Sequence, residues 1–156
     1  MLQEAGRPSQ SEGLSSELRE WLPAMHVLIV DNDSLLREGM QRMFYSRFGM
    51  ENVHLAVDGD KALERIEQQR GARRPPYDII ITDVRHPGAS ASEIFAAGQA
   101  AWSGYPIYKV LFTAEDMVPE RWAGMGAHAY VRKPSSVFLL EKAIFDAAGF
   151  QANRAA

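Results

Sequence analysis

The stretch HVLIVDNDSLL, from His26 to Leu36, decides how the rest of the chain is interpreted. Its apolar start ends in Asp31, Asn32 and Asp33, and a helical pattern begins directly afterwards. A short, continuous apolar run is typical of a buried strand in a parallel sheet. Acidic side chains at the end of such a strand can bind a divalent cation, act as a nucleophile or cap the next helix. The remaining sequence has to decide among these roles.

The composition is that of an ordinary globular domain. The chain has 156 residues, of which 46% are hydrophobic and 24% charged, enough to bury a core. The net charge of −3 provides no general attraction to nucleic acid or an anionic membrane, so we expect neither as a partner. The absence of cysteine excludes disulfides, thiolate zinc sites and cysteine nucleophiles. Without a long apolar run or a secretion signal, we expect a cytoplasmic protein.

The N-terminal segment, residues 1–24, differs from the rest of the chain. Residues 1–13 are polar and rich in Ser, Gly and Gln, which predicts mobility. Apolar residues then recur at helical spacing up to Pro23: Leu14, Leu18, Trp21 and Leu22. This spacing predicts a short amphipathic helix, either packed loosely on the domain or docked onto a partner. We therefore interpret residues 1–24 as an extension.

From residue 25 onward, apolar strands alternate with amphipathic helices across short loops. Strands are expected at 26–30, 53–57, 77–83, 107–113 and 128–131, and the later helices at 91–102, 118–124 and 136–148. Such alternation indicates right-handed βαβ units and a parallel sheet covered on both faces. It matches the α/β doubly wound, flavodoxin-like fold, with five strands in the order 2-1-3-4-5. We assign residues 25–149 to this domain and 150–156 to a C-terminal tail.

Polar residues follow the carboxyl ends of four expected strands. The first strand ends in 31–33 (Asp-Asn-Asp), the third in Asp83, the fourth in Thr113 and the fifth just before Lys133. Ligands of doubly wound sheets bind at this edge. One Asp after a strand is more often a helix cap than a catalyst, but four such groups together indicate a site.

This combination of side chains suits phosphoryl transfer. Clustered carboxylates repel one another and favour a divalent cation, and Mg²⁺ prefers oxygen ligands. The cation and a lysine ammonium can neutralise charge on phosphoryl oxygens, to which a threonine hydroxyl can donate a hydrogen bond. The remaining carboxylate is then free to attack.

Four segments, LIVDND, YDIIITDVRHPG, VLFTA and AYVRKP, resemble the signature segments of response-regulator receiver domains of two-component signalling. The match covers residues 25–148 in the family's order and spacing. The resemblance implies a signalling phosphoprotein rather than an enzyme, with at most self-phosphorylation and autodephosphorylation activity. It also implies that the phosphoryl group comes from a phosphohistidine on a sensor histidine kinase or phosphotransfer protein.

The resemblance assigns a role to each polar residue at this edge. Asp83 corresponds to the phosphoacceptor. Asp31, Asp83 and the backbone carbonyl of Arg85 correspond to the ligands of Mg²⁺. Lys133 corresponds to the residue that pairs with the phosphoryl oxygens, and the family pattern implies a cis peptide bond before Pro134.

The resemblance further implies a conformational switch. Thr113 corresponds to the hydroxyl that moves toward the phosphoryl group, and Tyr130 to the aromatic residue whose rotamer follows; alternatively, Tyr130 is a half-buried strand residue without a switching role. The switch would act on the face formed by 118–124, 128–131 and the closing helix, where a downstream protein or a second copy would bind.

The closing helix carries more apolar residues than one buried stripe requires. Leu140, Ala143, Ile144 and Ala147 make a natural inward face. We therefore expect Trp122, Phe138 and Phe145 to form a partner face, unless these aromatic rings fold back onto the core. Only 23 residues follow Lys133, so we expect this chain to act by protein contact and not through a DNA-binding domain of its own.

The sequence departs from the family pattern at two places. Asn32 replaces the second of two adjacent acids; an amide oxygen can bind Mg²⁺ but adds no charge, which predicts weaker metal binding. Asp33 would compensate as a ligand or would cap the next helix, and the turn expected here favours the cap. The Asp-Gly that usually follows the phosphoacceptor turn is also absent from residues 89–91.

Two other functions use the same residues. The first strand also resembles that of haloacid-dehalogenase-type phosphatases, with Asp31 as nucleophile and Asp33 as general acid and base. That family needs an acidic pair after the lysine, whereas only Glu141 and Asp146 follow it here, on a helix; it also gives Asp83 no role. A pseudo-receiver, a binding module that has lost phosphorylation because of Asn32, is the second alternative.

Overall fold

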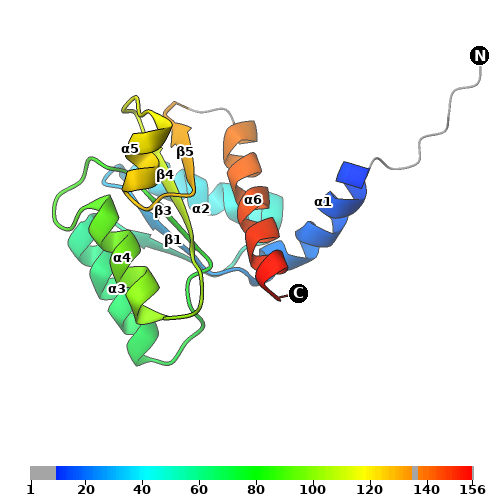
Figure 1. Ribbon diagram of the computed structural model, residues 1–156, viewed down its shortest axis with the longest axis horizontal. Coiled ribbons are helices and arrows are strands. Elements are labelled where there is room, and N and C mark those ends of the chain that lie inside the picture. The colour runs from blue at the N-terminus through cyan, green and yellow to red at the C-terminus, as the bar shows by residue number, and fades with distance from the viewer. Residues whose placement is uncertain (1–9, 135–136, 156) are drawn as a thin grey trace, which may run out of the picture.

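The computed structural model describes residues 10–134 and 137–155 (Figure 1). The strands are β1 Val27–Val30, β2 Val53–Ala56, β3 Ile79–Thr82, β4 Tyr108–Thr113 and β5 Ala129–Arg132. The helices are α1 Gln10–Trp21, η1 Leu22–Ala24, α2 Ser34–Phe48, α3 Gly59–Gly71, α4 Ala91–Ala101, α5 Pro119–Gly124 and α6 Val137–Ala155.

The five strands form one parallel sheet in the order β2-β1-β3-β4-β5, which confirms the predicted doubly wound, flavodoxin-like topology. Val30, the last residue of β1, pairs with Ala56 on one side and Thr82 on the other. The central strands therefore end level with one another. This register brings the residues that follow them to a common edge.

The core consists of two layers, one on each face of the sheet. Val27 and Ile29 face the layer built with α2 and α6, whereas Leu28 and Val30 face the layer built with α3 and α4. All four side chains are buried because β1 is covered on both faces. Figure 1 shows α3 and α4 side by side on one face, with α2 and α6 across the sheet.

The N-terminal extension is anchored where it joins the sheet. Helix α1 packs against α6, and Leu22 directly after it is only 1% exposed in the core under α2 and α6. The Arg19 guanidinium lies 5.3 Å from the centre of the Phe145 ring. Residues 1–9, for which we predicted mobility, lie outside the described residues, and residues 10–13 are helical.

The prediction that residues 150–156 form a tail was wrong, because α6 continues to Ala155. Gln151 is buried, and its amide Nε2 donates to the carbonyl oxygens of Asp78 and Pro106, both at 3.0 Å. Phe150 packs against Tyr108. The helix therefore continues because a polar side chain in its last turns satisfies buried carbonyl groups. Within the described residues, no helix has the length and apolar character needed to cross a membrane.

The structure divides the three residues expected to form a partner face. Phe138 is 77% exposed. Phe145 instead packs edge-on against Phe48, with ring centres 6.0 Å apart, and lies under Arg19 of α1. Trp122 is partly buried against the α3–α4 layer. Only Phe138 thus remains fully available, because the extension and the core cover the other two.

Acidification below about pH 6.5 is expected to destabilise the fold partly through His54. Its Nδ1 lies 2.6 Å from the Tyr77 hydroxyl, and burial, aided by the charge of Arg65, lowers the pKa of His54 below its ordinary 6.5. The unfolded chain then binds more protons than the folded chain, so stability is lost as the pH falls through 6.5. Urea unfolding between pH 5 and pH 8 should show that His54→Gln loses less free energy of unfolding on acidification than the wild type. Equal losses in the two proteins would contradict this role of His54.

Candidate functional site

Asp31 and Asp83 emerge from adjacent strands at the carboxyl edge of the sheet. The backbone N–H of Asp31 donates to Ala56 O (3.1 Å), and that of Asp83 donates to Val30 O (3.0 Å). Strand-type hydrogen bonding thus continues one residue past β1 and β3 and fixes both backbones. The two carboxylates are almost completely buried, at 2% and 8% exposure.

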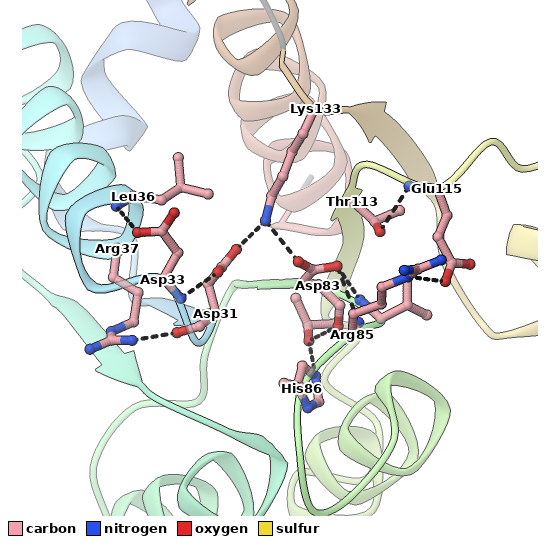
Figure 2. Close-up of polar contacts among 12 residues, drawn as sticks. Asp31, Asp33, Leu36, Arg37, Asp83, Arg85, His86, Thr113, Glu115 and Lys133 are labelled. Carbon is pink, nitrogen blue, oxygen red and sulfur yellow. Dashed lines mark hydrogen bonds and ion pairs between the residues drawn. The ribbon is translucent and has the colours of Figure 1, made fainter.

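Lys133 joins the two carboxylates, as Figure 2 shows. Its Nζ donates to Asp31 Oδ2 at 2.5 Å and to Asp83 Oδ2 at 2.8 Å. Its backbone N–H donates to Thr113 O at 2.8 Å, and the peptide bond to Pro134 is cis, as expected. The residue that follows β5 therefore places its ammonium group between the carboxylates that follow β1 and β3.

These contacts fix the charges in the site. Burial alone would raise the pKa of the Asp83 carboxyl, but the Lys133 ammonium, the nearby Thr113 hydroxyl and the backbone N–H of Arg85 outweigh it, and the pKa is lowered. Burial likewise opposes the charge of Lys133, but the two carboxylates outweigh it and raise the pKa of the ammonium. Asp83 is therefore an anion and Lys133 a cation at neutral pH, as a nucleophile and an electrostatic partner require.

The β1–α2 loop uses Asp33 as a helix cap. Its carboxylate accepts the backbone N–H of Leu36 at 3.2 Å, at the first turn of α2 (Figure 2). Its own N–H donates to Asp31 Oδ1 at 2.9 Å, and Arg37 donates to Asp31 O at 2.6 Å. Asn32 is exposed at the turn. The structure thus places Asp33 in the capping role that the turn favoured.

The loop after Asp83 is fastened to the start of α3, by residues that the sequence analysis missed. Gly59 N–H donates to Pro87 O (3.0 Å), and Ala89 N–H donates to Asp60 Oδ1 (3.1 Å). These bonds hold the turn in place without the Asp-Gly of the family pattern. The only signal in the sequence is the glycine that follows Asp58. Asp58 itself caps α3, and a capping aspartate is typical of many helix starts.

Glu115 connects the remaining site residues, and the sequence analysis missed it too. Its carboxylate pairs with Arg85 Nε at 2.6 Å and with Arg121 of α5 at 3.1 Å. Its backbone N–H donates to Thr113 Oγ1 (3.3 Å), and its carbonyl oxygen accepts the Tyr130 hydroxyl (2.5 Å). The β4–α5 loop is therefore tied to the loop after Asp83, to β5 and to α5. An acid two residues after a strand carries no pattern that would reveal this position.

A sequence model of the response regulator receiver domain matches residues 27–145. The chain belongs to this family. Receiver domains of response regulators are signalling proteins of two-component systems rather than classical enzymes.

Curated relatives of this receiver domain include response regulators named MprA. Those of Mycobacterium avium (strain 104) and Mycobacterium leprae (strain TN) are each 34% identical over 120 residues, which is 76% of this chain and 47% of the relative. The chain therefore spans about half the length of the curated relatives that it matches.

Solved receiver structures share the fold. Chemotaxis protein CheY4 of Vibrio cholerae is 25% identical, with a TM-score of 0.64 over 79% of this chain and 98% of that chain. The receiver domain of the sensor histidine kinase PA1611 from Pseudomonas aeruginosa, which coordinates a magnesium ion in its active site cleft, has a TM-score of 0.61 at 21% identity over 80% of this chain and 98% of that chain. At that identity the likeness shows the fold alone.

Proposed function

We propose that this receiver domain accepts a phosphoryl group on the Asp83 carboxylate from a phosphohistidine of a sensor histidine kinase or phosphotransfer protein. The observation that carries the proposal is the convergence of Asp83, Asp31 and Lys133 at one edge of the sheet. An ionised Asp83 can attack phosphorus, and the Lys133 ammonium can then pair with the transferred phosphoryl oxygens. Because both carboxylates are buried, only phosphoryl donors whose shape fits this edge of the sheet can reach Asp83.

We further propose that the site binds Mg²⁺ through Asp31, Asp83 and the backbone carbonyl of Arg85. Mg²⁺ commonly takes one or two protein carboxylates and keeps several waters, so this donor set fits the ion. When bound, the cation neutralises charge on the phosphoryl oxygens. The described residues contain no cluster of three or more acidic or histidine side chains suited to a metal, in keeping with Asn32 and with the capping role of Asp33.

Incubation with acetyl phosphate and Mg²⁺, followed by peptide mapping, tests the proposal. We expect one phosphoryl group, attached to Asp83. A phosphoryl group on Asp31 would instead favour the haloacid-dehalogenase-type phosphatase. No incorporation in excess Mg²⁺ would favour the pseudo-receiver, a binding module without phosphorylation.

Asn32→Asp should tighten Mg²⁺ binding about tenfold, or roughly 1.4 kcal/mol, because it adds a full negative charge to the β1–α2 turn beside Asp31. Titration calorimetry with MgCl₂ measures the change. Gln68→Glu is the matched control: it adds the same charge near the end of α3, away from this edge of the sheet, so the affinity should stay near that of the wild type. An Asn32→Asp affinity that is unchanged or weaker would contradict the metal site proposed here.

The proposed switch begins at Thr113. In this structure its hydroxyl accepts a hydrogen bond from the backbone N–H of Glu115. That hydrogen bond is broken when the hydroxyl turns toward a phosphoryl group on Asp83. Glu115 also holds Arg121 of α5 and the hydroxyl of Tyr130. Movement of this loop would therefore reach α5 and β5 together, which supports Tyr130 as part of the switch.

We place the partner face on β5 and α6. A groove of about 370 Å³ lies there beside Leu139, lined by Ala129, Tyr130, Val131, Arg132, Leu139, Lys142, Ala143 and Asp146. Leu139 is 51% exposed and Phe138 even more so. A second copy of the chain could bury both side chains, and a downstream protein is the alternative occupant.

Phe138→Asp is expected to prevent concentration-dependent dimerisation, because it places a charge where an apolar side chain would be buried. Light scattering of the acetyl phosphate-treated protein over a range of concentrations measures the effect. Leu35→Asp, at a position 81% exposed on α2 and away from this groove, is the control and should dimerise normally. A wild type that stays monomeric at all concentrations would exclude the dimer.

A further inference from the structure

The four lysines of the chain fall into two classes. Lys61 pairs with Glu64, Lys142 with Asp146, and Lys133 with the two site aspartates. Lys109 differs: its Nζ donates to the amide oxygen of Gln99 at 3.1 Å, and no carboxylate of the described residues lies within ion-pair distance. Lys109 is therefore the lysine whose charge no anion in the described structure compensates.

Lys109 lies in a groove with neutral walls. It projects from β4 between α4 and α5 into a groove of about 340 Å³, lined also by Ser92, Phe95, Ala96, Gln99, Gly124, Met125 and Gly126. None of these neighbours carries a charge. The side chain is partly exposed, so a small molecule can reach the amine from solvent.

The surroundings of Lys109 enlarge the fraction of its amine that is uncharged. Burial lowers its pKa, whereas the hydrogen bond to Glu64 raises the pKa of Lys61. The Nδ1 of His128 accepts the backbone N–H of Lys109 at 3.0 Å. Burial and the charge of Lys109 lower the pKa of His128, and an imidazole, neutral or protonated, offers Lys109 no negative charge. At a given pH, Lys109 therefore has the larger nucleophilic fraction.

We propose that Lys109 is a site of covalent acylation by acyl phosphates. The neutral Nζ attacks the carbonyl carbon of the acyl phosphate and forms an N–C bond. The C–O bond to phosphate breaks, inorganic phosphate leaves with the electron pair, and the surplus proton on nitrogen passes to water. The product is a neutral amide, which the uncharged groove accommodates without an unpaired charge. This reaction uses neither Asp83 nor Mg²⁺.

Acetyl phosphate in the presence of EDTA at pH 8 tests the inference, with site-resolved mass spectrometry of the acetylated peptides. Lys109 should acquire acetyl groups at least about threefold faster than Lys61 and Lys142, because carboxylates pair with the ammonium groups of Lys61 and Lys142 and none of the described residues does so for Lys109. A rate at Lys109 equal to or below theirs would overturn the inference. Asp83→Asn should leave the rate at Lys109 unchanged, so this test and the phosphorylation test fail separately.

Gln99→Glu sharpens the test, because it places a carboxylate at the atom that Lys109 already contacts. The acetylation rate of Lys109, divided by that of Lys142 in the same protein, should fall to the corresponding ratio for Lys61. Gln68→Glu adds the same charge on α3 and should leave the rate at the wild-type value. A folded Gln99→Glu protein with an unchanged rate at Lys109 would contradict the role of the missing counter-ion. If this variant does not fold, the comparison with Lys61 and Lys142 in the wild type decides.

Discussion

Asp83→Asn is expected to abolish incorporation of the phosphoryl group from acetyl phosphate. An amide is not a nucleophile toward phosphorus, and the neighbouring carboxylate of Asp31 is already held by Lys133 and by the Asp33 backbone. Asparagine keeps the shape of aspartate, so Lys133 retains one anion, Asp31, and one hydrogen-bond acceptor. The fold should therefore survive while the reaction is lost.

Intact-mass measurement before and after treatment, with circular dichroism as the folding check, measures this outcome. Asp116→Asn is the control, because Asp116 is exposed on the loop after β4 and pairs only with Arg132 in the described structure. It should be phosphorylated like the wild type. A phosphoryl group that persists in folded Asp83→Asn would show that another carboxylate is the acceptor.

Gly59→Ala is expected to destabilise the domain by about 3 kcal/mol. A Cβ at Gly59 would overlap with the carbonyl oxygen of Ala89 and lie 2.6 Å from its carbonyl carbon. These are backbone atoms of the loop that follows Asp83, which the Gly59 N–H and the Asp60 carboxylate hold in place through hydrogen bonds to Pro87 and Ala89. The loop has to move away, and the hydrogen bonds that fasten it to α3 are lost with it.

Urea denaturation gives the free energy of unfolding for this comparison. Gly39→Ala in α2 is the matched control, since a Cβ there would meet no packing neighbour within 4 Å among the described residues. It should stabilise the protein by about 0.5–1 kcal/mol through helix propensity. Equal stabilities of the two variants would mean that the contact between α3 and this loop is not tight.

The sheet and its edge could be predicted because each depends on local patterns. Apolar strands such as 27–30, alternating with helices, determine the topology almost alone, and parallel strands necessarily bring Asp31 and Asp83 to one edge. The cap at Asp33 was likewise predictable from the turn. These features follow from neighbouring residues and from the general geometry of doubly wound sheets.

The errors arose where contacts join segments far apart in the chain. Residues 150–156 were interpreted as a tail, yet Gln151 satisfies carbonyl groups 73 and 45 residues earlier in the chain. Phe145 was expected on the partner face, with packing onto the core as the alternative, and its cover comes from Arg19 of the extension and Phe48 of α2. Glu115 has no distinctive spacing, and its two arginine partners are recognisable only once the loops are in place. Such contacts cannot be read from periodicity.

The burial of Leu22 changes where the domain can safely be cut. A shortened protein that starts at Met25, the boundary indicated by the strand pattern, would lack a side chain that fills the interior beneath α2 and α6. The resulting void would cost about 3 kcal/mol by analogy with large-to-small substitutions, and newly wetted apolar surface would promote aggregation. Recombinant expression intended for calorimetry or crystallisation should therefore retain the segment from Gln10 onward.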